Sequence, residues 1–137
     1  MWWRAHSLSR IWVGVATLAI VILVASMIPV PPATPQTDPT GTVDTTTLLH
    51  IAGYAALAAG GVVAVARDGW PWRRRSRSVG IGAVAGVVAL VALFGVGTEL
   101  LQATIPWRTF AVAEIGLNAA SATGGGLAAM WFYHPVE

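Results

Sequence analysis

The sequence predicts an all-α integral membrane protein, a bundle of four transmembrane helices. Hydrophobic residues make up 55% of the chain and charged residues only 10%, whereas an ordinary soluble domain carries about 25% charged residues. Four stretches, 11–30, 48–66, 79–102 and 113–133, are mainly apolar, and each is close to the ~20 residues that cross a bilayer as a helix. Because little chain remains beside them, we expect residues 1–137 to form a single membrane domain.

Turn and capping residues separate the four stretches. Prolines recur between 29 and 39 and prevent the first helix from continuing, and the threonines at 45–47 are suitable caps for the second. Gly69 and Pro71 interrupt the chain between the second and third stretches, and Pro106 ends the third. The first stretch could alternatively be a signal peptide, but its apolar run exceeds the roughly 7–15 residues of such a segment. A retained helix is therefore the preferred interpretation.

The arginines predict the orientation of the helices. Apart from Arg108, they lie in two segments, 1–10 and 67–77. Positively charged loops stay in the cytoplasm, so we expect both segments and both termini to be cytoplasmic, in a multi-pass protein of the plasma membrane. Segments 31–47 and 106–110 should then lie outside. A solvated cytoplasmic loop also explains the basic segment better than a nucleic-acid interface does.

Small residues predict where the helices pack together. Helices in lipid associate through close van der Waals contact, which small side chains allow. The candidate packing positions are Ala52, Ala56 and Gly60 in the second stretch, Gly82 and Gly86 in the third, and the three glycines 124–126 in the fourth. The glycines at 124–126 could alternatively form a flexible hinge.

Polar residues gather at the predicted outer ends of the last three stretches. Spacings of three or four residues place them in pairs on single helix faces. The pairs are His50 with Tyr54, Glu99 with Gln102, and Glu114 with Asn118, and Arg108 lies in the turn between the last two stretches. A charge inside a bilayer costs on the order of 3 kcal/mol or more unless it is paired or hydrated. We therefore expect the functional site among these residues.

A head group is the ligand that these residue types fit best. Arg108 can bind a phosphate or carboxylate through two parallel hydrogen bonds. The polar side chains expected to orient that ligand are Tyr54, Gln102, Glu114 and Asn118. Arg108 should also pair with Glu99 or Glu114 within about 4 Å, with His50 and Gln102 in the same cluster. A purely structural ion-pair network that fixes the outer turn is the alternative.

Acid–base catalysis is a second possibility. Glu99 and His50 carry the groups that general acid–base catalysis uses, so both are candidate catalytic residues. A divalent metal on His50 and the two glutamates is a third possibility. Because the chain has neither an HExxH nor an HxxE spacing around these residues, the sequence predicts no metal and no cofactor.

These motifs resemble those of the VanZ-like family, small polytopic membrane proteins named for a teicoplanin-resistance protein. The family pattern is Asp-Lys-x-x-His-x-x-x-Tyr, Glu-x-x-Gln, an Arg in a short turn, and Asp-x-x-x-Asn-x-x-Gly. The matching residues here are, in order, His50, Tyr54, Glu99, Gln102, Arg108, Glu114 and Asn118. Glu114 matches with Glu in place of Asp, and two features depart from the pattern: Thr46 and Thr47 replace the Asp-Lys pair, and Ser121 replaces the final Gly.

The resemblance implies a membrane location and a role in the cell envelope or in glycopeptide resistance, without implying a reaction. The leading interpretation is a protein that engages an envelope lipid, or a lipid-anchored molecule, at the outer leaflet. One alternative is a membrane-embedded hydrolase or transferase that acts on a lipid head group. Another is a structural or assembly protein in which the polar residues only join helices. The sequence leaves enzymatic activity and oligomeric state open.

Overall fold

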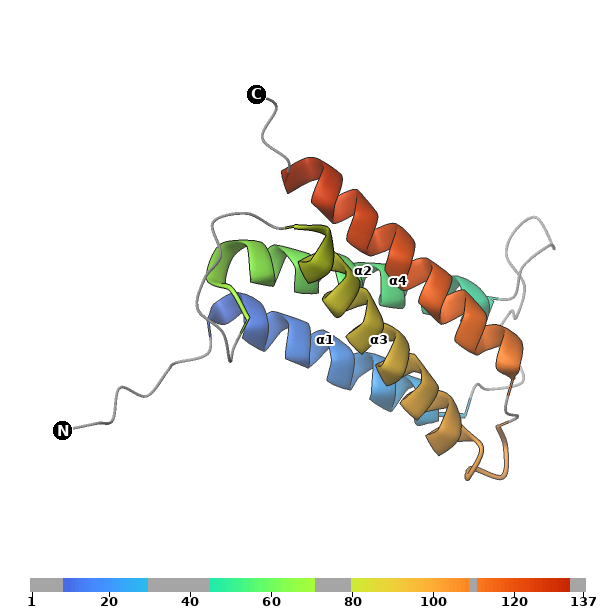
Figure 1. Cartoon of the computed structure of the whole chain (residues 1–137). Coiled ribbons are helices and arrows are strands. Elements are labelled where there is room, and N and C mark those ends of the chain that lie inside the picture. Colours follow the sequence, from blue (N-terminus) through green and yellow to red (C-terminus); the bar gives the residue numbers. More distant parts are fainter. Residues whose placement is uncertain (1–8, 30–44, 71–79, 109–110, 134–137) are drawn as a thin grey trace.

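The computed structural model describes residues 9–29, 45–70, 80–108 and 111–133. They form four α-helices, and successive helices run in opposite directions (Figure 1). The helices are α1 (Arg10–Met27), α2 (Thr45–Asp68), α3 (Ile81–Gln102) and α4 (Val112–Tyr133). The all-α prediction is therefore confirmed. The largest differences from the predicted bounds are three residues, at the end of α1 (27 against 30) and the start of α2 (45 against 48).

Three of the described helices are long and apolar enough to cross a membrane. They are α1, α2 from Thr46 onward, and α3, with 18, 23 and 22 residues. At about 1.5 Å per residue, such helices are roughly as long as the hydrocarbon layer is thick. The chain is thus a multi-pass helical membrane protein. Helix α4 also has 22 residues, but it is not among the helices that reach this apolarity.

Local capping explains where α1 begins and where α2 ends. The Ser9 hydroxyl accepts a hydrogen bond from the Trp12 backbone N–H at the start of α1. At the end of α2, Gly69 has a φ of 75°, a conformation that side-chain-bearing residues rarely adopt. Its N–H donates to the Val65 carbonyl at 3.0 Å, and its carbonyl accepts from the Trp12 indole at 3.2 Å. These contacts join α1 to the end of α2.

The core lies where α2, α3 and α4 face one another. Its buried side chains include Tyr54, Leu57 and Val62 of α2, Val84, Val87 and Val91 of α3, and Ala122 and Ala129 of α4. Helices α4 and α2 approach each other closely at Gly125. A Cβ atom added there would lie far inside van der Waals contact with the Ala55 carbonyl oxygen. Only glycine therefore fits at this point of α4.

The predicted packing positions are confirmed in part. Helix α4 continues unbroken through 124–126, and Gly125 and Gly126 both face neighbouring helices. By contrast, Ala52 and Ala56 are exposed. A Cβ at Gly82 or at Gly124 would meet no described atom within 4 Å. The prediction for these four positions is wrong because a small side chain permits a close approach but does not determine which way its helix faces.

The topology predictions rest largely on segments outside the described residues. These segments are 1–8, 30–44, 71–79, 109–110 and 134–137, which include both termini and most of the basic connection. Two arginines do lie within described helices. Arg10 is in the first turn of α1 and Arg67 is in the last turn of α2, so both are at the same end of the bundle.

Candidate functional site

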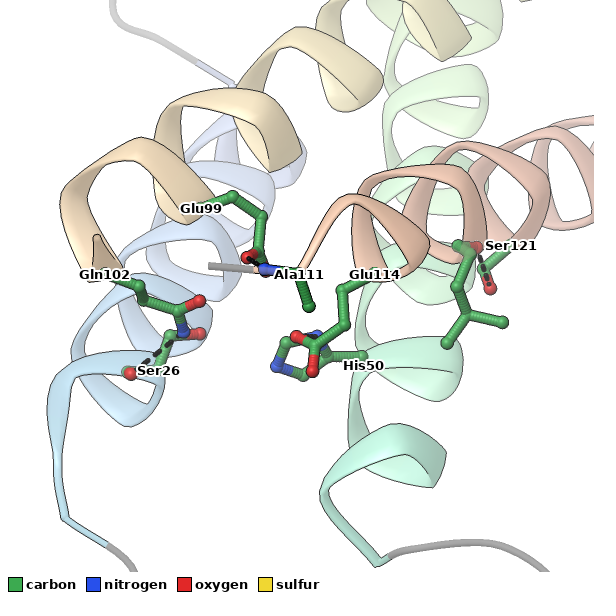
Figure 2. Close-up of polar contacts among 8 residues, drawn as sticks. Ser26, His50, Glu99, Gln102, Ala111, Glu114 and Ser121 are labelled. Atoms are coloured by element: carbon green, nitrogen blue, oxygen red, sulfur yellow. Dashed lines mark hydrogen bonds and ion pairs between the residues drawn. The ribbon is translucent and has the colours of Figure 1, made fainter. Parts of the chain in front are cut away.

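His50, Glu99 and Glu114 meet at the other end of the bundle (Figure 2). His50 lies near the start of α2, Glu99 in the last turn of α3 and Glu114 in the first turn of α4. Because α2 and α4 begin at the end where α3 finishes, these three positions are brought to one level. One ligand atom from each residue lies within 4.8 Å of the other two. We call these three residues the polar cluster.

Two members of the polar cluster are buried, and the third is partly exposed. Glu99 is 0% exposed and His50 is 7% exposed. The Glu114 side chain, in contrast, is 38% exposed. The cluster is therefore accessible from the protein surface at Glu114, whereas Glu99 is its most deeply buried member.

Two buried atoms of the polar cluster have unmet hydrogen-bonding capacity. Glu99 Oε2 accepts a long hydrogen bond from the Ala111 N–H at 3.5 Å, while Glu99 Oε1 has no hydrogen-bond partner in the described part of the chain. His50 Nδ1 lies 3.5 Å from Glu114 Oε2, which is within ion-pair range but beyond the usual 2.7–3.2 Å of a hydrogen bond. Buried polar groups of this kind normally have a partner or coordinate a metal.

Tyr54 and Asn118 lie one helical turn deeper than the polar cluster. Both are buried, and both pack against Gly95, which precedes Glu99 by one turn of α3. The Tyr54 ring centroid is 6.0 Å from that of His50. Neither side-chain atom of the Asn118 amide has a hydrogen-bond partner among the residues described. The sequence-predicted Tyr54 and Asn118 thus form a buried layer beneath the cluster.

Gln102 and Arg108 make their hydrogen bonds elsewhere, with the end of α1. The Gln102 side-chain amide is buried and donates to the Ser26 carbonyl at 3.1 Å, and Arg108 Nη2 donates to the Ile28 carbonyl at 3.2 Å. The last carbonyls of a helix have no partner within it, and cations are favoured beside them. These two residues therefore cap α1.

The predicted ion pair of Arg108 with a glutamate is wrong. Within the described ranges, the ion pair closer than 4.0 Å is the one between His50 and Glu114. The free carbonyls at the end of α1 provide Arg108 with a different partner. Gln102 likewise bonds to α1 rather than to a member of the polar cluster (Figure 2).

The sequence interpretation missed two partners of the site residues. The Ser26 carbonyl accepts from Gln102, and the Ala111 N–H donates to Glu99 (Figure 2). Both are backbone groups, which every non-proline residue carries. The identity of these residues therefore gives no signal for the contact.

No protein-family model, curated protein or solved structure matches this chain. The functional argument therefore depends on the geometry of the polar cluster. An imidazole beside two carboxylates can accept hydrogen bonds from a hydroxyl or an ammonium group, exchange protons with a substrate, or bind a cation.

Proposed function

We propose that this chain is a four-span membrane protein of VanZ-like type that binds the head group of an envelope lipid, or of a lipid-linked molecule, at the outer leaflet. The observation that supports this proposal is the polar cluster itself. It is buried at Glu99, open at Glu114, and located at one end of a bundle of apolar helices. Ionisable groups at such a depth are costly, and they commonly mark functional sites.

Two observations support the proposed orientation and the fourth span. Arg10 and Arg67 lie at the end of the bundle away from the polar cluster, so the positive-inside rule favours an extracytoplasmic cluster. Helix α4 is as long as α3 and runs beside α2. Its exposed side chains include Leu127, Trp131 and Phe132, which suit contact with lipid and with the membrane interface.

The chemistry of the cluster indicates what kind of head group it would bind. Carboxylates are hydrogen-bond acceptors, so Glu99 and Glu114 favour a ligand with hydroxyl or ammonium groups. Arg108 lies at the same end and uses Nη2 to bond Ile28, and its other N–H groups could contact a phosphate. The VanZ-like pattern of residues supports an envelope role for such binding.

A second candidate function is acid–base catalysis on the same head group. The specific observation in its favour is the imidazole of His50 beside Glu114, with the buried carboxylate of Glu99 within reach. Glu99→Gln distinguishes the two functions because it keeps the shape and removes the charge. A binding protein loses affinity, whereas an enzyme still binds its lipid but no longer converts it. A protein in which the cluster only joins helices loses thermal stability first.

The test is to purify the full chain from its native membrane in detergent and to identify the co-purifying lipids by mass spectrometry. We expect one envelope lipid or lipid-linked molecule to be enriched with the wild type and lost from Glu114→Gln. Because the Glu114 side chain is partly exposed, this variant should still fold. Asp68→Asn, at the opposite end of α2, is the matched control and should retain the lipid. Identical lipid profiles for all three proteins would refute the proposal.

A further inference from the structure

The three members of the polar cluster have the chemistry of a metal-binding set. A neutral imidazole and two carboxylates are common ligands of Zn²⁺ and of neighbouring transition-metal ions. In this protein they come from three different helices. Ligands arranged in this way have no local sequence spacing, which is why motifs such as HExxH give no sign of them.

The distances within the cluster fit coordination better than direct hydrogen bonding. Two ligands bound at about 2.1 Å to a tetrahedral ion lie about 3.4 Å apart. His50 Nδ1 and Glu114 Oε2 are 3.5 Å apart, and the three ligand atoms all lie within 4.8 Å of one another. Inward movements of about 1.4 Å or less would therefore bring the ligand atoms to coordination distance.

The unpartnered buried atoms provide independent support. Glu99 is fully buried, and its Oε1 has no hydrogen-bond partner among the described residues although it belongs to the cluster. His50 Nδ1 is likewise buried without a hydrogen bond to any described residue. A divalent cation would use both atoms and would balance the charges of the two carboxylates, of which Glu99 is fully buried.

We propose that His50, Glu99 and Glu114 bind one divalent transition-metal ion of the Zn²⁺ or Mn²⁺ class. Mg²⁺ and Ca²⁺ prefer sites built from oxygen alone, so the imidazole disfavours them. Three protein ligands leave at least one coordination position free. Since Glu114 is the exposed member of the cluster, this position is accessible from the protein surface and could take water or an oxygen of a bound ligand.

The experiment uses the full chain, purified in detergent without a histidine tag and stripped of metal with a chelator. Zn²⁺, Mn²⁺ or Mg²⁺ is added alone, and the bound metal is measured by elemental analysis after dialysis. Co²⁺ provides a second readout, because its visible absorption spectrum reports the number and type of ligands. No lipid is needed, so failure of this test leaves the lipid-binding proposal standing.

The expected result is one equivalent of Zn²⁺ or Mn²⁺ per chain, with much weaker binding of Mg²⁺. Glu99→Gln and Glu114→Gln should each weaken metal binding at least ~10-fold. Even residues that only hydrogen-bond to a metal ligand usually have an effect of about this size. The matched control replaces the other two histidines of the chain, as His6→Gln with His134→Gln, and should retain the full equivalent.

Three results of the metal-binding assay would overturn the proposal: no Zn²⁺ or Mn²⁺ bound to the wild type, Mg²⁺ bound as tightly as Zn²⁺, or unchanged binding in Glu114→Gln. If Glu99→Gln fails to fold, Glu114→Gln decides the question because its side chain is partly exposed. The Co²⁺ spectrum of the wild type gives a result that requires no variant. A spectrum of fully hydrated Co²⁺ would also contradict the site.

Discussion

At the scale of single residues, Gln102 and Arg108 show how polar side chains at and just beyond the end of one helix can cap the end of another. Their donors reach the carbonyls of Ser26 and Ile28, at the end of α1. The bond to Ser26 is buried, and an unsatisfied polar group is expensive in such a place. The two side chains therefore hold α1 against the end of α3, beside the polar cluster but not within it.

Gln102→Met tests this structural role, because it keeps the length of the side chain and removes the donor. We expect a loss of about 1 kcal/mol in the free energy of unfolding, typical of a hydrogen bond between membrane helices. Thermal unfolding in detergent measures it, and Leu101→Met, at an exposed neighbouring position, is the control. An unchanged unfolding midpoint together with a loss of lipid binding would instead place Gln102 in the site.

The sequence predicts which residues lie at this end of the bundle, but not which hydrogen-bond or ion-pair partners they have. Helix direction alone places His50, Glu99 and Glu114 at one level, and the structure brings them together. The partner of Arg108 depends on the end of α1, where the acceptor is a backbone carbonyl. Side-chain patterns contain no information on such an acceptor, and the predicted ion pair of Arg108 with a glutamate is wrong for this reason.

At the scale of helices, the contact between α2 and α4 depends on one glycine. The backbone of α2 at Ala55 occupies the space that a side chain at Gly125 would need, whereas a Cβ at Gly124 would meet no described atom within 4 Å. These neighbouring positions thus provide a matched pair of substitutions. Both replace glycine by alanine in the same turn of α4, and only one disturbs the contact.

We expect Gly125→Ala to lower the free energy of unfolding by at least about 1–3 kcal/mol, the usual cost of overpacking. Gly124→Ala should leave stability unchanged or raise it by up to ~1 kcal/mol through helix propensity. Thermal unfolding of both variants in the same detergent is the measurement. Equal effects of the two substitutions would show that the close approach of α4 to α2 does not exist in the protein.

Helix positions were easier to predict from the sequence than helix faces. Proline, glycine and charge mark the boundaries, and the predicted bounds agree with the structure within three residues (27 against 30, 45 against 48). A helix that is apolar on all sides has no amphipathic pattern to show which side is buried. The exposed Ala52 and the closely packed Gly125 therefore cannot be distinguished by sequence alone.

At the scale of the whole molecule, the proposed orientation can be tested because the chain contains no cysteine. Single cysteines at Thr40, Ser76 and Val136 would sample three segments outside the described residues. With four spans and a cytoplasmic N-terminus, a membrane-impermeant maleimide should label Thr40→Cys in intact cells. Ser76→Cys and Val136→Cys should react only after permeabilisation. Labelling of Val136→Cys in intact cells would show that α4 does not cross the membrane.

The contact of Gly125 with Ala55 also determines how motion can pass through the bundle. Glycine and alanine have no side-chain rotamers to lose, so bringing them together costs almost no side-chain entropy. For the same reason the contact cannot relax by a change of rotamer, so a shift of α4 against α2 at this point has to move backbone. His50 belongs to α2 and Glu114 to α4, so the contact ties together the two backbones that carry these side chains, while the side chains themselves remain free to rotate.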